Sequence, residues 1–116
     1  MKNVIIAAFV ILALFSGTLR AQENIEKKKI EFLISSIANL KGAIFIRNGS
    51  EYNGQEAAKH LRMKLQNVLV VETADDFIKL CASKSSVSGK PYLIRLSDGK
   101  TIKSEEYFRK KLKEYR

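Results

Sequence analysis

Polar side chains of the kind that bind ligands or move protons gather in two short segments and at one histidine. The first segment, residues 47–52, surrounds an Asn-Gly pair, and the second, residues 84–90, holds two lysines and three serines. A turn carried by a rigid strand is a common place for recognition residues. The candidate ligand-binding residues are therefore Arg47, Asn48, Ser50, Tyr52, His60, Lys84, Ser85, Ser86 and Lys90.

A catalytic interpretation of the same residues makes His60 a general base for Ser85 or Ser86. The loop that carries these serines has neither a Gly-x-Ser-x-Gly nor a Ser-x-x-Lys motif. Its Gly89-Lys90 pair also lacks the other residues of a nucleotide P-loop. With a single histidine, no metal-ligand spacing arises. We expect no catalytic residue, no metal site and no cofactor, and keep a small hydrolase as the alternative.

Each candidate residue also has a structural interpretation. Asn-Gly is turn chemistry, and Glu51 could pair with Arg47. His60 falls at the margin of a helical apolar stripe, where it could bond a backbone carbonyl. The serines of the 84–90 loop could hydrogen-bond the end of one element and the start of the next. Both interpretations remain open at the level of sequence.

Amphipathic helices must position these residues. Capping-box patterns at Asn53 and Thr73 mark two helix starts, and Ser104 is expected to cap a last helix. Apolar residues recur at helical spacing in three earlier segments, which are residues 25–40, 54–67 and 73–82.

Short β-branched and aromatic runs predict the strands between these helices. Residues 43–46 form one run, and residues 92–96 and 101–103 flank Asp98-Gly99, a strong hairpin signal. The expected order is helix, strand, helix, helix, strand, strand, helix. This order predicts an α+β fold with helices packed on a small, mostly antiparallel three-stranded sheet.

The N-terminal 21 residues have the pattern of a secretory signal peptide. Lys2 precedes an unbroken apolar run, residues 4–15, which is shorter than the roughly 20 residues that a membrane-spanning helix needs. Ala21 suits the last position before a cleavage site. We expect a signal peptide over residues 1–21 and a single compact domain over residues 22–116. The mature protein would be periplasmic or secreted, monomeric and without a transmembrane anchor.

Charge and cysteine content narrow the partners. Residues 1–21 hold two of the 21 basic residues and none of the 12 acidic ones, so the mature chain carries 19 basic residues and a net charge of +7. Such a charge favours anionic partners, including envelope polymers, by attraction that salt weakens. No nucleic-acid motif accompanies it, and we expect no specific nucleic-acid binding. Cys81, the one cysteine, lies four residues after Phe77 on a predicted helix, which predicts a small buried hydrophobe.

Four ordered segments resemble the YfeK-like family of small exported bacterial proteins of unknown function. They are residues 45–52 (FIRNGSEY), 56–62 (EAAKHLR), 73–78 (TADDFI) and 82–92 (ASKSSVSGKPY). The resemblance implies a signal peptide followed by one compact domain. It brings no established activity, substrate or cofactor.

The resemblance also implies a strand arrangement. Members of the family often carry one cysteine before the Phe-Ile-Arg-Asn-Gly segment and another after the Ser-Gly-Lys-Pro-Tyr segment, and Ala43 and Leu96 occupy these places here. A disulfide between them in relatives would put the two strands side by side. This chain would then rely on apolar packing alone.

Together these observations favour a non-enzymatic binding or accessory module of the cell envelope. Its unidentified ligand or protein partner would meet the 47–52 turn, His60 and the 84–90 loop. The alternatives are the hydrolase above and an electrostatic binder of anionic envelope polymers.

Overall fold

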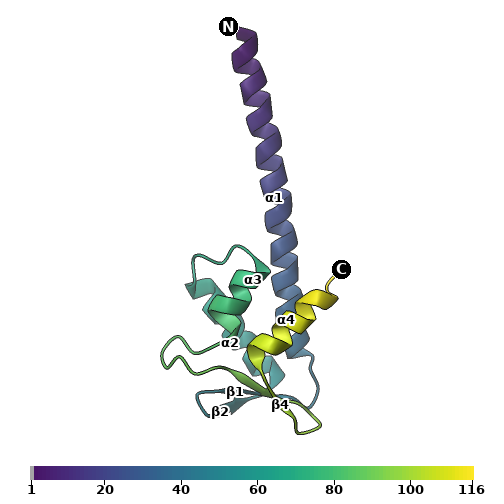
Figure 1. Ribbon diagram of the computed structural model, residues 1–116, viewed down its shortest axis with the longest axis vertical. Helices are drawn as coiled ribbons and strands as arrows, with labels where there is room; N and C mark the ends of the chain where they lie inside the picture. Colours follow the sequence, from purple (N-terminus) through teal and green to yellow (C-terminus); the bar gives the residue numbers. More distant parts are fainter. Residues whose placement is uncertain (1) are drawn as a thin grey trace.

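The computed structural model describes the backbone of residues 2–116 and the side chains of residues 20–116 (Figure 1). Helices and strands follow one another without a long linker. In chain order the elements are α1 Lys2–Ala38, β1 Ile44–Arg47, β2 Ser50–Tyr52, α2 Gly54–Asn67, α3 Ala74–Phe77, the π-helix η1 Ile78–Ala82, β3 Leu93–Arg95, β4 Thr101–Lys103 and α4 Ser104–Glu114.

Helix α1 runs without a break through the predicted signal segment and the first predicted helix, and its N-terminal part extends far beyond the rest of the fold (Figure 1). The predicted apolar stripe is confirmed, because Leu33, Ile34 and Ile37 are fully buried. The side chains of residues 4–15, on which the signal-peptide prediction depends, lie outside the described residues. In the part of the chain that the structure describes, no helix is long and apolar enough to cross a membrane.

The sheet is antiparallel and has four strands in the order β2-β1-β3-β4, so the prediction of three strands was wrong. The missed strand, β2, follows a turn in which Asn48 and Gly49 both have positive φ, 51° and 80°. Turns of this kind match the twist of a two-residue hairpin. Strand β2 has only three residues, and Ser50 and Glu51 are exposed. An edge strand this short and polar has no apolar alternation to reveal it.

Strands β1 and β3 are neighbours, as the family resemblance implies. Their register pairs Ile44 with Arg95, so the next position outward sets Ala43 against Leu96. One step further, a Cβ on Gly42 would lie 2.9 Å from the Cβ of Ser97. The two segments of the chain, residues 42–43 and 96–97, therefore stay close beyond the ends of the strands.

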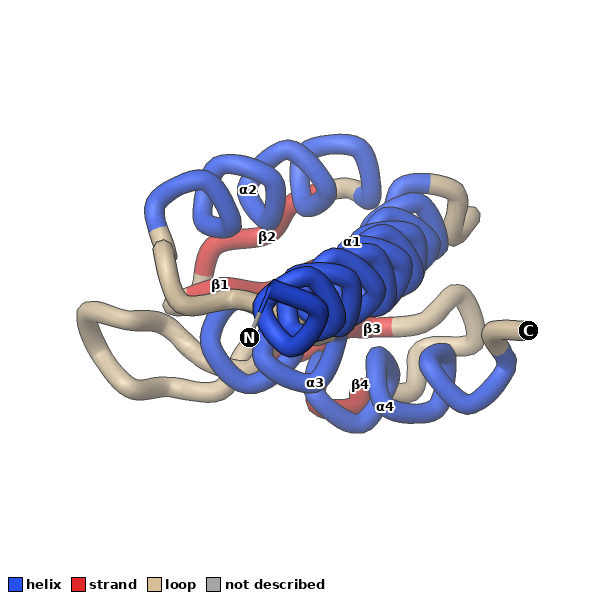
Figure 2. Tube along the Cα trace, turned by 90° about the horizontal axis from the view of Figure 1, so that it is seen from above, coloured by secondary structure: helices blue, strands red, loops and turns tan. Residues whose placement is uncertain are grey.

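The helices cover one face of this sheet, with α1 crossing over it between α2 and α4 (Figures 1 and 2). Phe45 and Ile94 oppose each other on β1 and β3 and are buried beneath the helices. Phe77 and Phe108 meet edge to face, with ring centroids 6.2 Å apart. Gly54 opens α2 against the C-terminal turn of α1, where a Cβ would overlap a backbone carbonyl. The core therefore contains side chains from every layer.

The two predicted capping boxes are confirmed. The Asn53 side chain accepts a hydrogen bond from the backbone N–H of Glu56 at 2.8 Å, and Thr73 accepts one from Asp76 at 3.0 Å. The predicted cap at Ser104 is wrong. Lys103 occupies the N-cap position of α4, and Ser104 is fully buried with its hydroxyl unpaired. Because β4 runs directly into α4, there is no loop in which a capping serine could stay at the surface.

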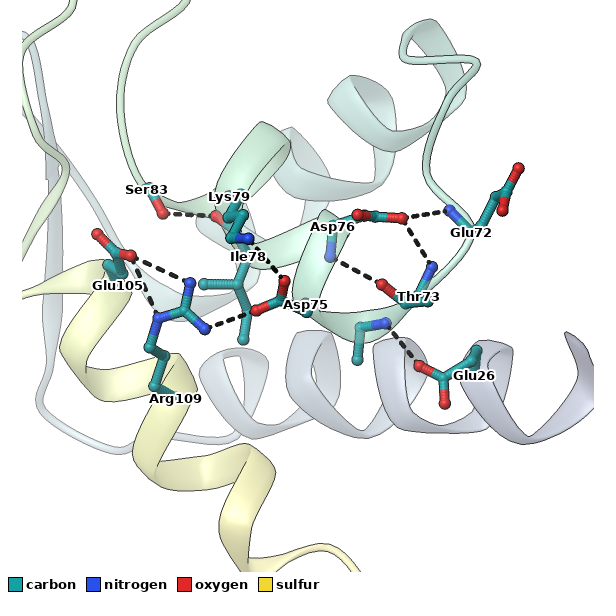
Figure 3. A network of polar contacts seen from close by, with 11 residues as sticks. Glu26, Glu72, Thr73, Asp75, Asp76, Ile78, Lys79, Ser83, Glu105 and Arg109 are labelled. Carbon is teal, nitrogen blue, oxygen red and sulfur yellow. Dashed lines mark hydrogen bonds and ion pairs between the residues drawn. The ribbon is translucent and has the colours of Figure 1, made fainter. Parts of the chain in front are cut away.

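Polar contacts fix α3 between α1 and α4 (Figure 3). The Glu26 carboxylate accepts a hydrogen bond of 2.9 Å from the N–H of Ala74, and this contact, followed by that with Lys29, lowers the pKa of Glu26. On the other side, Arg109 donates to Asp75 at 2.8 Å. The helical segment then widens into η1, where the Ser83 hydroxyl donates to the carbonyl of Ile78 at 2.5 Å. These contacts orient the segment that carries Cys81.

Candidate functional site

The two predicted polar segments meet in space. Asn48 Nδ2 donates to Ser85 Oγ at 3.1 Å, and the Ser88 hydroxyl donates to Asn48 Oδ1 at 2.5 Å. These bonds join the β1–β2 turn to the loop between η1 and β3, about 40 residues later in the chain. The candidate residues on the two segments therefore share one side of the molecule.

Ser85 is a structural residue of its loop. Its side chain is 2% exposed, and besides the bond from Asn48 its hydroxyl accepts longer contacts of 3.3 Å from the backbone N–H groups of Val87 and Ser88. Its own N–H donates to the carbonyl of Lys90 at 3.0 Å. These bonds give Ser85 a structural role, but they hold its own loop and the β1–β2 turn, whereas the sequence predicted bonds to the end of one element and the start of the next.

A groove of about 500 Å³ opens beside the loop, between α2, β1 and residues 86–87. Its floor is apolar, formed by the buried side chains Phe45, Leu61, Cys81 and Tyr92. Its polar lining comes from Arg47, His60, Lys64, Asn67 and Ser86. None of the described residues that line it is an aspartate or a glutamate. The groove is therefore apolar at its base and cationic at its sides.

Lys64 is the groove residue that sequence reasoning missed. Its ammonium donates to the carbonyl of Lys84 at 2.9 Å and to the hydroxyl of Tyr92 at 3.1 Å, and it lies 5.0 Å from the centre of the Tyr92 ring. The available signal was helical spacing, because Lys64 follows His60 by one turn and shares its face. Its charge is held at the groove by neutral partners.

Arg47 lies at the end of β1, half-buried, with its Nε buried and without a hydrogen-bond partner. The suggested pairing with Glu51 is wrong, because Glu51 pairs with Arg95 on β3 at 2.7 Å. In the described part of the chain, neither Arg47 nor Lys64 forms a salt bridge. Both cations remain available to an anionic group in the groove.

His60 is half-buried, as its place on the helix predicts, and its ring packs edge to face against Tyr52, with centroids 4.7 Å apart. Among the described residues, no hydrogen bond joins His60 to a backbone carbonyl, Ser85 or Ser86. The structural interpretation had the wrong partner, since an aromatic contact replaces the expected carbonyl. Tyr52 thus positions the imidazole at the groove.

The other candidates lie around the groove without lining it, except Ser86. Ser50 is exposed on β2, opposite Arg47 in the sheet register. Lys84 and Lys90 are exposed at the two ends of the loop. The backbone of Lys84 pairs with that of Pro91 in an isolated antiparallel β-bridge. These residues contribute charge and hydrogen-bonding groups to the rim.

Cys81 is fully buried at the groove floor, which confirms the prediction of a small buried hydrophobe. Burial raises the pKa of its thiol above the ordinary value. A protonated thiol is a poor nucleophile. Within residues 20–116, no three His, Cys, Asp or Glu side chains converge as metal ligands would. The arrangement is suited to binding, with positive charge supplied by Arg47 and Lys64.

Comparison with known proteins matches residues 24–116 to a family of unknown function, DUF5329. The chain is 38% identical over 96 residues to the uncharacterized protein YfeK of Salmonella typhimurium. The matched region covers 79% of this chain and 77% of the relative. No solved structure matches the chain significantly. Since the family match covers residues 24–116, well over half of the chain, the chain belongs to the DUF5329 family.

Proposed function

We propose that this protein is an exported, non-enzymatic binding module of the cell envelope, and that its ligand is anionic. One observation carries the proposal: a groove with an apolar floor is flanked by Arg47, His60 and Lys64, and no carboxylate among the described residues lines it. Unpaired cations beside an apolar surface favour a ligand that has both an anionic and an apolar part. The signal-peptide pattern of residues 1–21 supports export.

The residues support binding more than hydrolysis. A serine nucleophile needs an adjacent base within hydrogen-bond reach. Ser85 is buried and occupied by three donors, and Ser86 has no hydrogen bond to His60 in the described structure. A hydrolase using His60 therefore has no supporting contact beyond the shared groove of His60 and Ser86.

An amide chemical-shift titration of residues 22–116 tests the proposal. The probe is a fractionated extract of the organism's own cell envelope. We expect shifts concentrated at Arg47, His60, Lys64 and the 84–90 loop. Arg47→Ala and Lys84→Ala should weaken the response while leaving the urea midpoint unchanged, and Lys113→Ala, an exposed lysine on α4, is the matched control.

Two outcomes would contradict the proposal. Shifts spread over the lysine-rich faces of α1 and α4 and removed by salt would indicate an unspecific binder of anionic polymers. Equal losses of stability and binding in Arg47→Ala would mean that Arg47 is structural. The hydrolase alternative has its own test, because His60→Ala should abolish any turnover that the protein shows.

A further inference from the structure

Four of the six large apolar side chains that are exposed in the described part of the chain lie at or next to the groove. Leu69 is 95% exposed, Val87 is 93% exposed, and Val70 and Met63 are more than half exposed. Met63 and Val87 line the groove, and Leu69 and Val70 directly follow Val68, which also lines it. Isolated exposed apolar residues are ordinary, but a group around one hollow marks an interaction site.

The two loops that carry these residues project from the same side of the molecule. The link between α2 and α3 holds Leu69 and Val70, and the loop after η1 holds Val87. In both views they leave the fold on the side opposite the C-terminus (Figures 1 and 2). We call this side, defined by Leu69, Val70, Val87 and the groove, the loop edge.

The loop edge is also cationic. Arg47 and Lys64 lie in the groove, and Lys84 and Lys90 are exposed beside Val87. None of these four residues pairs with a carboxylate among the described residues. Exposed aliphatic side chains next to unpaired cations suit the interface of an anionic bilayer, because the aliphatic groups can contact acyl chains while the cations contact the phosphate groups above them.

We propose that the loop edge docks on an anionic phospholipid bilayer. Leu69, Val70 and Val87 enter the boundary between headgroups and acyl chains, and the surrounding lysines contact lipid phosphates. This inference rests on the proposed binding function and names its partner. A protein partner fits less well, because protein interfaces are anchored by Trp, Tyr and Arg in shaped pockets. The exposed tips here are aliphatic and stand on separate loops.

Vesicle binding tests the inference on residues 22–116. This part holds every buried core residue that the structure describes, from Ile30 to Phe108, and the family match begins at residue 24. Omitting residues 1–21 prevents the apolar N-terminal run from binding lipid itself. Vesicles of phosphatidylcholine containing phosphatidylglycerol are compared with vesicles of phosphatidylcholine alone. We expect co-sedimentation only with the anionic vesicles.

Matched variants separate insertion from general attraction. Leu69→Ser with Val87→Ser should weaken vesicle binding by about a hundredfold, since each aliphatic side chain accounts for about tenfold. Ile25→Ser, at a residue 49% exposed on α1, should leave binding unchanged. The chain has no tryptophan, so Val87→Trp reports insertion by a blue shift of its emission, and Ile25→Trp should show none.

The results that would contradict the proposal differ in what they refute. Equal binding to both vesicles, equal loss in the Ile25→Ser control, or no blue shift in Val87→Trp would overturn the docking surface. Failure with vesicles combined with shifts at Arg47 and Lys64 from a water-soluble envelope fraction would refute the lipid partner and leave the proposed function standing. Failure with vesicles and with every envelope fraction would refute both.

Discussion

Replacing Ser104 by alanine should stabilise the protein, although the same replacement at a helix start ordinarily destabilises it. The side chain is fully buried, and its hydroxyl has no hydrogen-bond partner. Its backbone N–H is satisfied by the carbonyl of Tyr92 at 2.9 Å, a bond that alanine keeps. The substitution therefore removes one oxygen atom that lost its contact with water and gained nothing in return.

The magnitude follows from this difference. Leaving a buried hydroxyl unpaired costs about 1–3 kcal/mol, and deleting the oxygen loses only a few tenths of a kcal/mol of dispersion contacts. We expect Ser104→Ala to raise the free energy of unfolding by about 1 kcal/mol, or Tm by about 5 °C for a domain of this size. An N-cap serine would instead lose about 1 kcal/mol on the same change.

Urea unfolding of residues 22–116 at constant m-value measures the change. Ser36→Ala is the matched control, since it also deletes one hydroxyl. The Ser36 hydroxyl accepts a bond of 2.9 Å from the hydroxyl of Tyr107, which is buried, and donates to the carbonyl of Leu33 at 2.6 Å. Its loss strands the Tyr107 hydroxyl and should cost about 1–2 kcal/mol. A destabilised Ser104→Ala variant would refute the reasoning, because the hydroxyl would then have a partner.

Three further perturbations test the packing. Cysteines at Ala43 and Leu96 should form a disulfide on oxidation and add about 2–4 kcal/mol of stability, measured with and without reductant; thiols that stay free would contradict the β1–β3 register. Glu26→Gln should cost about 1 kcal/mol at neutral pH. Because the hydrogen bond from the first N–H of α3 lowers the pKa of the folded-state carboxyl, this stabilisation is complete above the usual value of 4.5 and disappears as the pH falls through the lowered one. A pH-independent difference would rule out the charge as its source. Gly54→Ala should lower stability by about 2 kcal/mol, since its Cβ would overlap a carbonyl of α1, and an unchanged urea midpoint would show that the two helices are less closely packed.

Part of the candidate site could be predicted, because the residue types that bind anions are visible in any sequence. Three of the ligand-binding candidates, Arg47, His60 and Ser86, line the groove, whereas Ser85 organises its loop. Lys64 was missed because a lysine on an exposed helical face is ordinarily solvated. Only the approach of the loop after η1, which places the carbonyl of Lys84 against its ammonium, turns Lys64 toward the groove.

The sequence by itself determined the features that depend on near neighbours in the chain. The capping boxes at Asn53 and Thr73, the Asp98-Gly99 hairpin, the buried stripe of α1 and the burial of Cys81 all follow from contacts within a few residues or from periodicity. These interactions form wherever the chain adopts the element, so their signal survives without the fold.

Only the tertiary structure decided which of several equivalent partners each polar residue meets. From the sequence, Glu51 could have paired with either Arg47 or Arg95. The register of β1 between β2 and β3 places it against Arg95. Asn48 joined Ser85 because the loop folds over the turn, and Ser104 was buried because β4 leads directly into α4. The physical reason is that such contacts join residues distant in sequence, whose approach is fixed by packing of the whole core.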